Sequence, residues 1–168
     1  MNRKPLKIVI ITVVLFALVF SLVYAAPARV SAKPVDEKEI KVYAYRIEPL
    51  VTMDEERPGF LSEVAKLIVE DPVMDVIVEV SPVAVLMKYS LIQSVGAAAI
   101  GLESDFSGAE LKDLVGLPLH VMEGKEYMLY FNTINPKGQP LYEAAVKNLE
   151  EIKNDGTFEE LRKKYNLD

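Results

Sequence analysis

The chain closes with LEEIKNDGTFEELRKKYNLD, residues 149–168, which has the pattern of two amphipathic helices separated by a turn at residues 154–156. Gly156 readily adopts the left-handed conformation that ends a helix. Thr157 and Glu160 have the spacing of a capping box for the second helix. The predicted inner face of that helix consists of Phe158, Leu161 and Tyr165. The stretch therefore predicts a helix pair that packs on a core.

The segments before this pair alternate in periodicity. The stretch 126–132, EYMLYFN, predicts a strand, and a helical stripe follows it at Leu141, Ala145, Leu149 and Ile152. Upstream, strands are predicted at 40–47, 73–80 and 96–101, with helices at 60–71 and from Ser81-Pro82 onward. The second of these helices has an apolar side made of Val83, Leu86, Met87, Ser90 and Leu91. This order predicts an α/β fold with a parallel-type sheet and flanking helices.

Length and composition limit the organisation of the chain. It has 168 residues, 51% of them hydrophobic, which suits one domain. Residues 1–32 combine early basic residues with an apolar run at 8–23, as in a secretory signal. Cleavage is expected after Ala25 or Ala32, with an uncleaved anchor through residues 8–23 as the alternative. The chain is therefore predicted to be periplasmic or extracellular, or anchored to the membrane, with 33–39 as a flexible lead-in.

Charge and cysteine content exclude several classes of partner. Four of the 19 Lys and Arg residues precede residue 33, so a cleaved chain carries 15 basic against 25 acidic residues, a net charge of −10. Such a surface repels nucleic acid and anionic lipid. The absence of cysteine excludes disulfides and a lipid-modified cysteine. The fold therefore depends on its apolar core.

Three motifs resemble one known family. They are the closing stretch at 149–168, EPLVTMDEERPGFLSEVAKLI at 48–68, and LIQSVGAAAIG at 91–101. Their order resembles the family 3 extracellular solute-binding proteins, the amino-acid-binding components of ABC importers. The resemblance implies a type II periplasmic-binding-protein-like fold, with a small solute and a membrane permease or other envelope protein as partners.

The chain departs from this family in length and in several residues, among them the one that binds a carboxylate. Residues 102–125 stand where the family inserts a second lobe, so 40–101 and 126–168 are predicted to form a single lobe. A compact connection at 102–125 would complete such a lobe, whereas disorder there would indicate a deletion. The family's carboxylate-binding Arg after the third strand is missing. Weak binding of an amino acid or small organic acid is expected, with a protein-interaction module that has lost its ligand as the alternative.

Candidate ligand-binding residues lie where the first and third predicted strands end, because ligands of such sheets bind outside the carboxyl ends of the strands. They are Tyr45, Arg46, Glu48, Leu50, Gly101 and Ser104. Arg46 is a candidate carboxylate contact, or else a solvated partner of Glu48. Tyr45 and Leu50 are candidate pocket walls.

The sequence predicts no enzyme, metal or cofactor. It has no cysteine nucleophile, G-x-S-x-G elbow, H-E-x-x-H pair or glycine-rich phosphate loop. His120 is the single histidine, and a structural role is expected for it. The acidic run at residues 54–56 lacks the alternating oxygen ligands of a calcium loop.

Overall fold

The computed structural model describes residues 39–70, 73–93 and 96–167. The predicted signal or anchor at 1–32 and the lead-in up to residue 38 lie outside the described residues. Glu39, assigned to the lead-in from sequence, opens the first strand. Within the described ranges, no helix is both long enough and apolar enough to cross a membrane.

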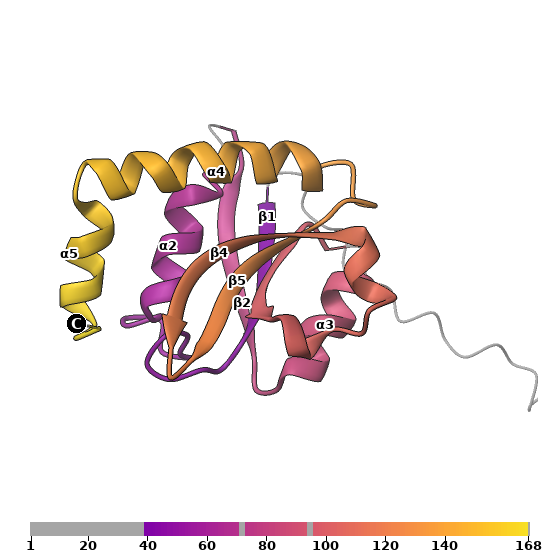
Figure 1. Cartoon of the computed structure of the whole chain (residues 1–168), viewed down its shortest axis with the longest axis horizontal. Coiled ribbons are helices and arrows are strands. Elements are labelled where there is room, and N and C mark those ends of the chain that lie inside the picture. Colours follow the sequence, from indigo (N-terminus) through magenta and orange to yellow (C-terminus); the bar gives the residue numbers. More distant parts are fainter. Residues whose placement is uncertain (1–38, 71–72, 94–95, 168) are drawn as a thin grey trace, which may run out of the picture. The chain divides into compact units, whose positions relative to one another are not determined.

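A five-stranded sheet organises the described residues (Figure 1). Its strands are β1 (Glu39–Tyr45), β2 (Asp75–Ser81), β3 (Ala98–Leu102), β4 (Leu114–Met122) and β5 (Lys125–Asn132). The helices are α2 (Phe60–Ile68), α3 (Ala84–Ile92), α4 (Gly138–Asn154) and α5 (Thr157–Lys164), with 3-10 turns η1 (Glu103–Asp105) and η2 (Glu110–Asp113). The strand order is β2-β1-β3-β5-β4.

The first three strands are parallel, as predicted, and the last two are not. β1 pairs in parallel with β2 and β3, whereas β5 runs antiparallel to both β3 and β4. A two-residue turn joins β4 to β5, with φ of 52° at Glu123 and 72° at Gly124. Positive φ at both positions suits a tight hairpin, and a parallel connection needs a dozen or more residues. The α/β fold with flanking helices is thus confirmed, and its sheet is mixed.

Residues 102–125 add to the sheet. They fold into η1, η2 and the edge strand β4, whose register with β5 runs from Leu114 opposite Asn132 to Met122 opposite Lys125. This part of the chain therefore provides one edge of the sheet.

Two apolar clusters cover the two faces of the sheet. The larger lies under α2, α4 and α5 and includes the fully buried side chains of Val42, Phe60 and Phe131. The smaller lies under α3 and includes Met87 and Tyr130. Figure 1 shows α4 crossing above α2, with α5 turning down beside α2. Within the described residues, α2, α4 and α5 thus cover one face of the sheet and α3 lies on the other.

The predicted inner face of α3 is only partly correct. Met87 and Leu91 are buried, but Val83 is 51% exposed and Leu86 is 47% exposed. Val83 has an extended backbone and the helix begins at Ala84, so it starts later than the predicted Ser81-Pro82. On this face α3 is joined by Phe106 and Leu111 of the segment after β3 and by no other α-helix of the described residues, so its outer side chains stay exposed.

The closing helix pair forms as predicted, with a different cap. Gly156 has φ of 90° between α4 and α5. The Thr157 N–H donates to Asp155 Oδ1 at 2.9 Å, and no capping box forms between Thr157 and Glu160. Asp155 lies two residues before that N–H and reaches it through a local turn. The buried Phe158 ring meets Phe60 edge-on, with centroids 5.3 Å apart.

Candidate functional site

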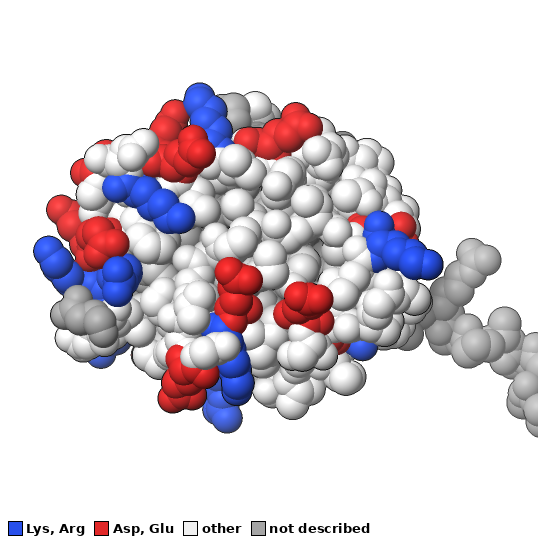
Figure 2. All heavy atoms as spheres, in the orientation of Figure 1, with Lys and Arg blue, Asp and Glu red and all other residues white. Residues whose placement is uncertain are grey.

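The carboxyl ends of β1, β2 and β3 lie at one end of the sheet because these strands are parallel. The loop at residues 46–59, called here the first loop, follows β1 at this end, and η1 follows β3. Figure 2 shows acidic and basic side chains near one another in the lower middle of this face, with others along its upper and left edges. This is the end where ligands of open α/β sheets bind.

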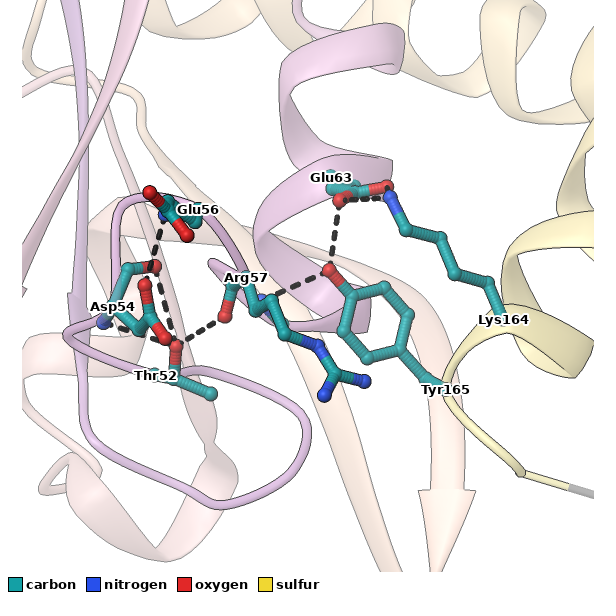
Figure 3. A network of polar contacts seen from close by, with 8 residues as sticks. Thr52, Asp54, Glu56, Arg57, Glu63, Lys164 and Tyr165 are labelled. Atoms are coloured by element: carbon teal, nitrogen blue, oxygen red, sulfur yellow. Dashed lines mark hydrogen bonds and ion pairs between the residues drawn. The ribbon is translucent and has the colours of Figure 1, made fainter.

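Hydrogen bonds within its own backbone and side chains order the first loop (Figure 3). Ile47 and Val51 exchange two backbone hydrogen bonds, at 2.9 and 2.7 Å. Thr52 Oγ1 donates to the Arg57 carbonyl and accepts from the Asp54 N–H at 3.2 Å. Asp54 Oδ1 accepts from the Glu56 N–H at 2.9 Å. The loop is therefore a compact turn with defined side-chain positions.

Gly59 joins this loop to α2. Its φ is 95°, and a Cβ atom built there would lie 2.5 Å from the Leu50 carbonyl oxygen. That same oxygen accepts from the Leu61 N–H at 2.8 Å. Only glycine combines this backbone conformation with such a close approach. Gly59, within the stretch at 48–68 that resembles the family, therefore fixes the loop against the helix.

The last residues of the chain hold the same junction (Figure 3). Tyr165 Oη donates to Glu63 Oε1 at 2.7 Å and accepts from the Gly59 N–H at 3.3 Å. Lys164 Nζ lies 2.7 Å from Glu63 Oε1. Burial opposes the charge on Glu63, but the hydrogen bonds from Lys164 and Tyr165 outweigh burial and lower its pKa. Burial and the Glu63 carboxylate raise the pKa of Tyr165 to about 12.

Four of the candidate residues from the sequence lie on or beside the first loop. Leu50 is fully buried and supports the loop from beneath, without reaching its surface. Arg46 and Glu48 are exposed and form an ion pair with 4.0 Å between Nε and Oε1, the solvated arrangement that the sequence left open. Tyr45 is half-buried, and burial, followed by the charge of Asp105, raises the pKa of its phenol.

Asp105, which the sequence reasoning did not single out, connects two of the candidates. It hydrogen-bonds with the Tyr45 side chain. Its Oδ2 accepts from the Leu102 N–H at 2.8 Å and lies 3.0 Å from where a Cβ on Gly101 would be. Gly101 itself is buried in β3. An Asp three residues after a strand end is a common local cap, and this was the available sequence signal.

Two separate hollows open at this end of the sheet. The first, of about 330 Å³, is lined by Glu48, Pro49, Thr52, Asp54, Arg57 and Tyr165. The second, of about 250 Å³, is lined by Leu102, Glu103, Ser104, Lys125, Glu126 and Met128, and is called here the hairpin hollow. Glu48 and Ser104 therefore belong to different hollows. The hairpin hollow pairs a hydroxyl and an ammonium group with two carboxylates.

In the part of the chain that the structure describes, no three His, Asp or Glu side chains gather as potential metal ligands. His120 instead meets the Phe60 ring edge-on, with centroids 5.3 Å apart. Burial, together with the charge of Arg162, lowers the pKa of its imidazole. His120 is thus an aromatic packing partner beside the closing helices.

Comparison with known proteins identifies the fold. No protein-family profile and no curated protein matches the chain. Among solved structures, the GluR0 ligand-binding core from Nostoc punctiforme in complex with L-glutamate aligns with a TM-score of 0.54 and 12% identity, covering 75% of this chain and 98% of that one. An arginine-bound form of domain 1 of TmArgBP aligns with a TM-score of 0.53 and 16% identity, covering 70% and 93%. Both are periplasmic-binding-protein-like domains of type II. The fold is that of a single lobe of this class.

Proposed function

We propose that this chain is an exported solute-binding protein that uses one lobe to bind an amino acid or small organic acid weakly, for ABC-type uptake or sensing. The hairpin hollow is the observation that carries the proposal. It lies at the carboxyl end of β3 and presents Lys125 beside Ser104. The neighbouring folds are solved with L-glutamate and with arginine, which supports a solute of this class.

The charges of the hairpin hollow match both ends of an amino acid. The Lys125 ammonium and the Ser104 hydroxyl suit a carboxylate, and Glu103 and Glu126 suit an ammonium. Lys125 thus takes the role of the Arg that the sequence lacks after its third strand. An ammonium lacks the two-pronged geometry of a guanidinium, so the contact is weaker.

One lobe shields only part of a ligand. The charged side chains of this hollow, Glu103, Lys125 and Glu126, are all exposed to water. Polar contacts that compete with solvent contribute about 1 kcal/mol each, so a few of them give dissociation constants in the millimolar range. The pairing of β4 with β5 supports the view that 102–125 completes the lobe and that no second lobe is needed for folding.

Amide NMR titration of residues 33–168 with glutamate, arginine and small organic acids tests this function. Saturable shifts are expected at Ser104 and Lys125, and the substitution Lys125→Gln is expected to weaken binding about fivefold. Lys112→Gln, at an exposed lysine on η2, is the matched control. If millimolar ligand shifts no amide signals around Arg46 and Ser104, this result counts against the proposal.

Export is a separate part of the proposal. A signal at residues 1–32 with cleavage after Ala25 or Ala32, or retention as an anchor through 8–23, agrees with the solute-binding fold. Mass spectrometry of the intact protein from cell fractions distinguishes the two cleavage sites from retention. Recovery of uncleaved chain from the cytoplasm alone would contradict export.

The exposed side of α3 favours a second candidate, a protein-interaction module. Val83, Val85, Leu86 and Tyr89 are between 47% and 66% exposed. Clusters of this kind mark contact surfaces. A pull-down from envelope extract, with Leu86→Glu as the disrupting variant, tests this candidate. Failure to recover a stoichiometric partner would weaken it.

A further inference from the structure

A third cavity, of about 430 Å³, lies away from the hairpin hollow and is called here the edge cavity. The first loop, α2 and the edge strand β2 line it, and it is open to solvent. The lining side chains that matter for its chemistry are Asp54, Glu55, Ser62, Lys66, Val76 and Val78. It shares no residue with the hairpin hollow, so its role is independent of the function proposed above.

Ser62 gives the edge cavity an unusual feature. The residue is fully buried. Among the buried side-chain polar atoms of the described residues, its hydroxyl oxygen is the one that lacks a hydrogen-bond partner. It lines the cavity from α2, one helical turn before Lys66, so both residues lie on the helix face toward the cavity. A buried hydroxyl without a partner opposes folding, and such groups in native proteins usually bind a water or a ligand.

The remaining walls favour a cation with an apolar body. Val76 and Val78 provide an apolar wall on β2, and Asp54 and Glu55 provide two carboxylates against the single ammonium of Lys66. Asp54 is held in place because its Oδ1 accepts from the Glu56 N–H at 2.9 Å. The cavity therefore has one excess negative charge, and the chain as a whole carries −6. Both charges attract a cation and repel an anion.

We propose that the edge cavity binds a primary amine with a compact, branched apolar body. The ammonium group donates to Asp54 and Glu55, and the Ser62 hydroxyl accepts its third N–H. The apolar body packs on Val76 and Val78. Because Ser62 is fully covered, the side chains of the first loop must part as the amine enters, and this requirement keeps the affinity low.

Three probes with the same branched apolar body test the proposed charge preference. Isopentylamine, isovalerate and leucine differ in carrying a positive charge, a negative charge or both. We expect isopentylamine to give saturable amide shifts around Ser62 and Val78 of the full chain, and to bind at least fivefold more tightly than leucine. Isovalerate is expected to give none there. Equal or tighter binding of leucine or isovalerate at these amides overturns the proposal.

Matched variants test the contacts. Ser62→Ala and Asp54→Asn are each expected to weaken isopentylamine binding about fivefold or more, the effect of one lost hydrogen bond. Ser107→Ala, at an exposed serine, is expected to leave binding unchanged. Wild-type affinity in Ser62→Ala overturns the assignment of the hydroxyl. Shifts confined to Ser104 and Lys125 support the solute-binding proposal and overturn this one, whereas shifts confined to Ser62 and Val78 do the reverse.

Discussion

Replacing Tyr165 with phenylalanine isolates the contact that seals the closing helices onto the rest of the lobe. The substitution removes one oxygen and leaves the ring, which is only 6% exposed, in place. That oxygen donates to Glu63 at 2.7 Å and accepts from the buried Gly59 N–H at 3.3 Å. The partners are 102 and 106 residues away in sequence, so the contact joins the two ends of the lobe.

The expected loss follows from these two bonds. A hydrogen bond to a charged group contributes about 1.5–3 kcal/mol, and Glu63 belongs near the lower limit because it keeps Lys164 and is 20% exposed. The Gly59 N–H then lacks its acceptor, which costs about another 1 kcal/mol. The free energy of unfolding should therefore fall by about 2–3 kcal/mol, a large part of the roughly 5–15 kcal/mol typical of a domain.

Urea denaturation followed by far-UV circular dichroism measures this loss, since the chain has no tryptophan to report by fluorescence. Tyr89→Phe is the matched control, because Tyr89 is 63% exposed and its change should stay within about 0.5 kcal/mol. A double-mutant cycle with Glu63→Gln should give a coupling energy of about 1 kcal/mol or more. If Tyr165→Phe costs no more than Tyr89→Phe, the terminal residues do not seal the lobe.

The other expected outcomes concern backbone, core and pH. Gly59→Ala should lower the free energy of unfolding by more than about 2 kcal/mol in the same urea assay, whereas Gly108→Ala, where an added Cβ meets nothing within 4 Å, should change it little. Ser62→Ala should raise the free energy of unfolding of the unliganded protein by up to about 1 kcal/mol, since it removes an unpaired buried hydroxyl; a loss would mean that the hydroxyl has a partner. The lowered pKa of Glu63 contributes stability that is present above its unfolded value of 4.5 and is lost as pH falls below it, so Glu63→Gln should flatten an acid melting profile. The raised pKa of Tyr165 contributes stability below pH 10 that is lost as pH rises toward about 12, and Tyr165→Phe should remove its share of that alkaline loss.

Sequence reasoning predicted most elements of the fold and few contacts of the site. The alternation at residues 40–101 gave three parallel strands and two helices in the correct order. Among the candidate residues, Arg46 and Glu48 form an exposed ion pair, which was one of the two roles predicted for Arg46. The sequence did not predict that Leu50 is buried, because an apolar residue in a loop can equally line a pocket or belong to the core.

The missed residues depend on distant contacts. Asp105 meets Tyr45 only because β1 lies beside β3, and Lys125 joins the hairpin hollow only because β5 lies beside β3. The inner face of α3 was overestimated for a related reason: helical spacing shows which residues share a side, but not how much of that side another element covers.

The sequence by itself determined the features that neighbouring residues control: the period of each strand and helix, the left-handed turn at Gly156 and the buried stripe of the closing helices. Only the tertiary structure decided the antiparallel direction of β5, the bond between Tyr165 and Glu63, and the unpaired hydroxyl of Ser62. The reason is physical. Periodicity and turn conformation depend on residues a few positions apart, whereas strand direction, hydrogen-bond partners and cavities depend on which remote segments pack together.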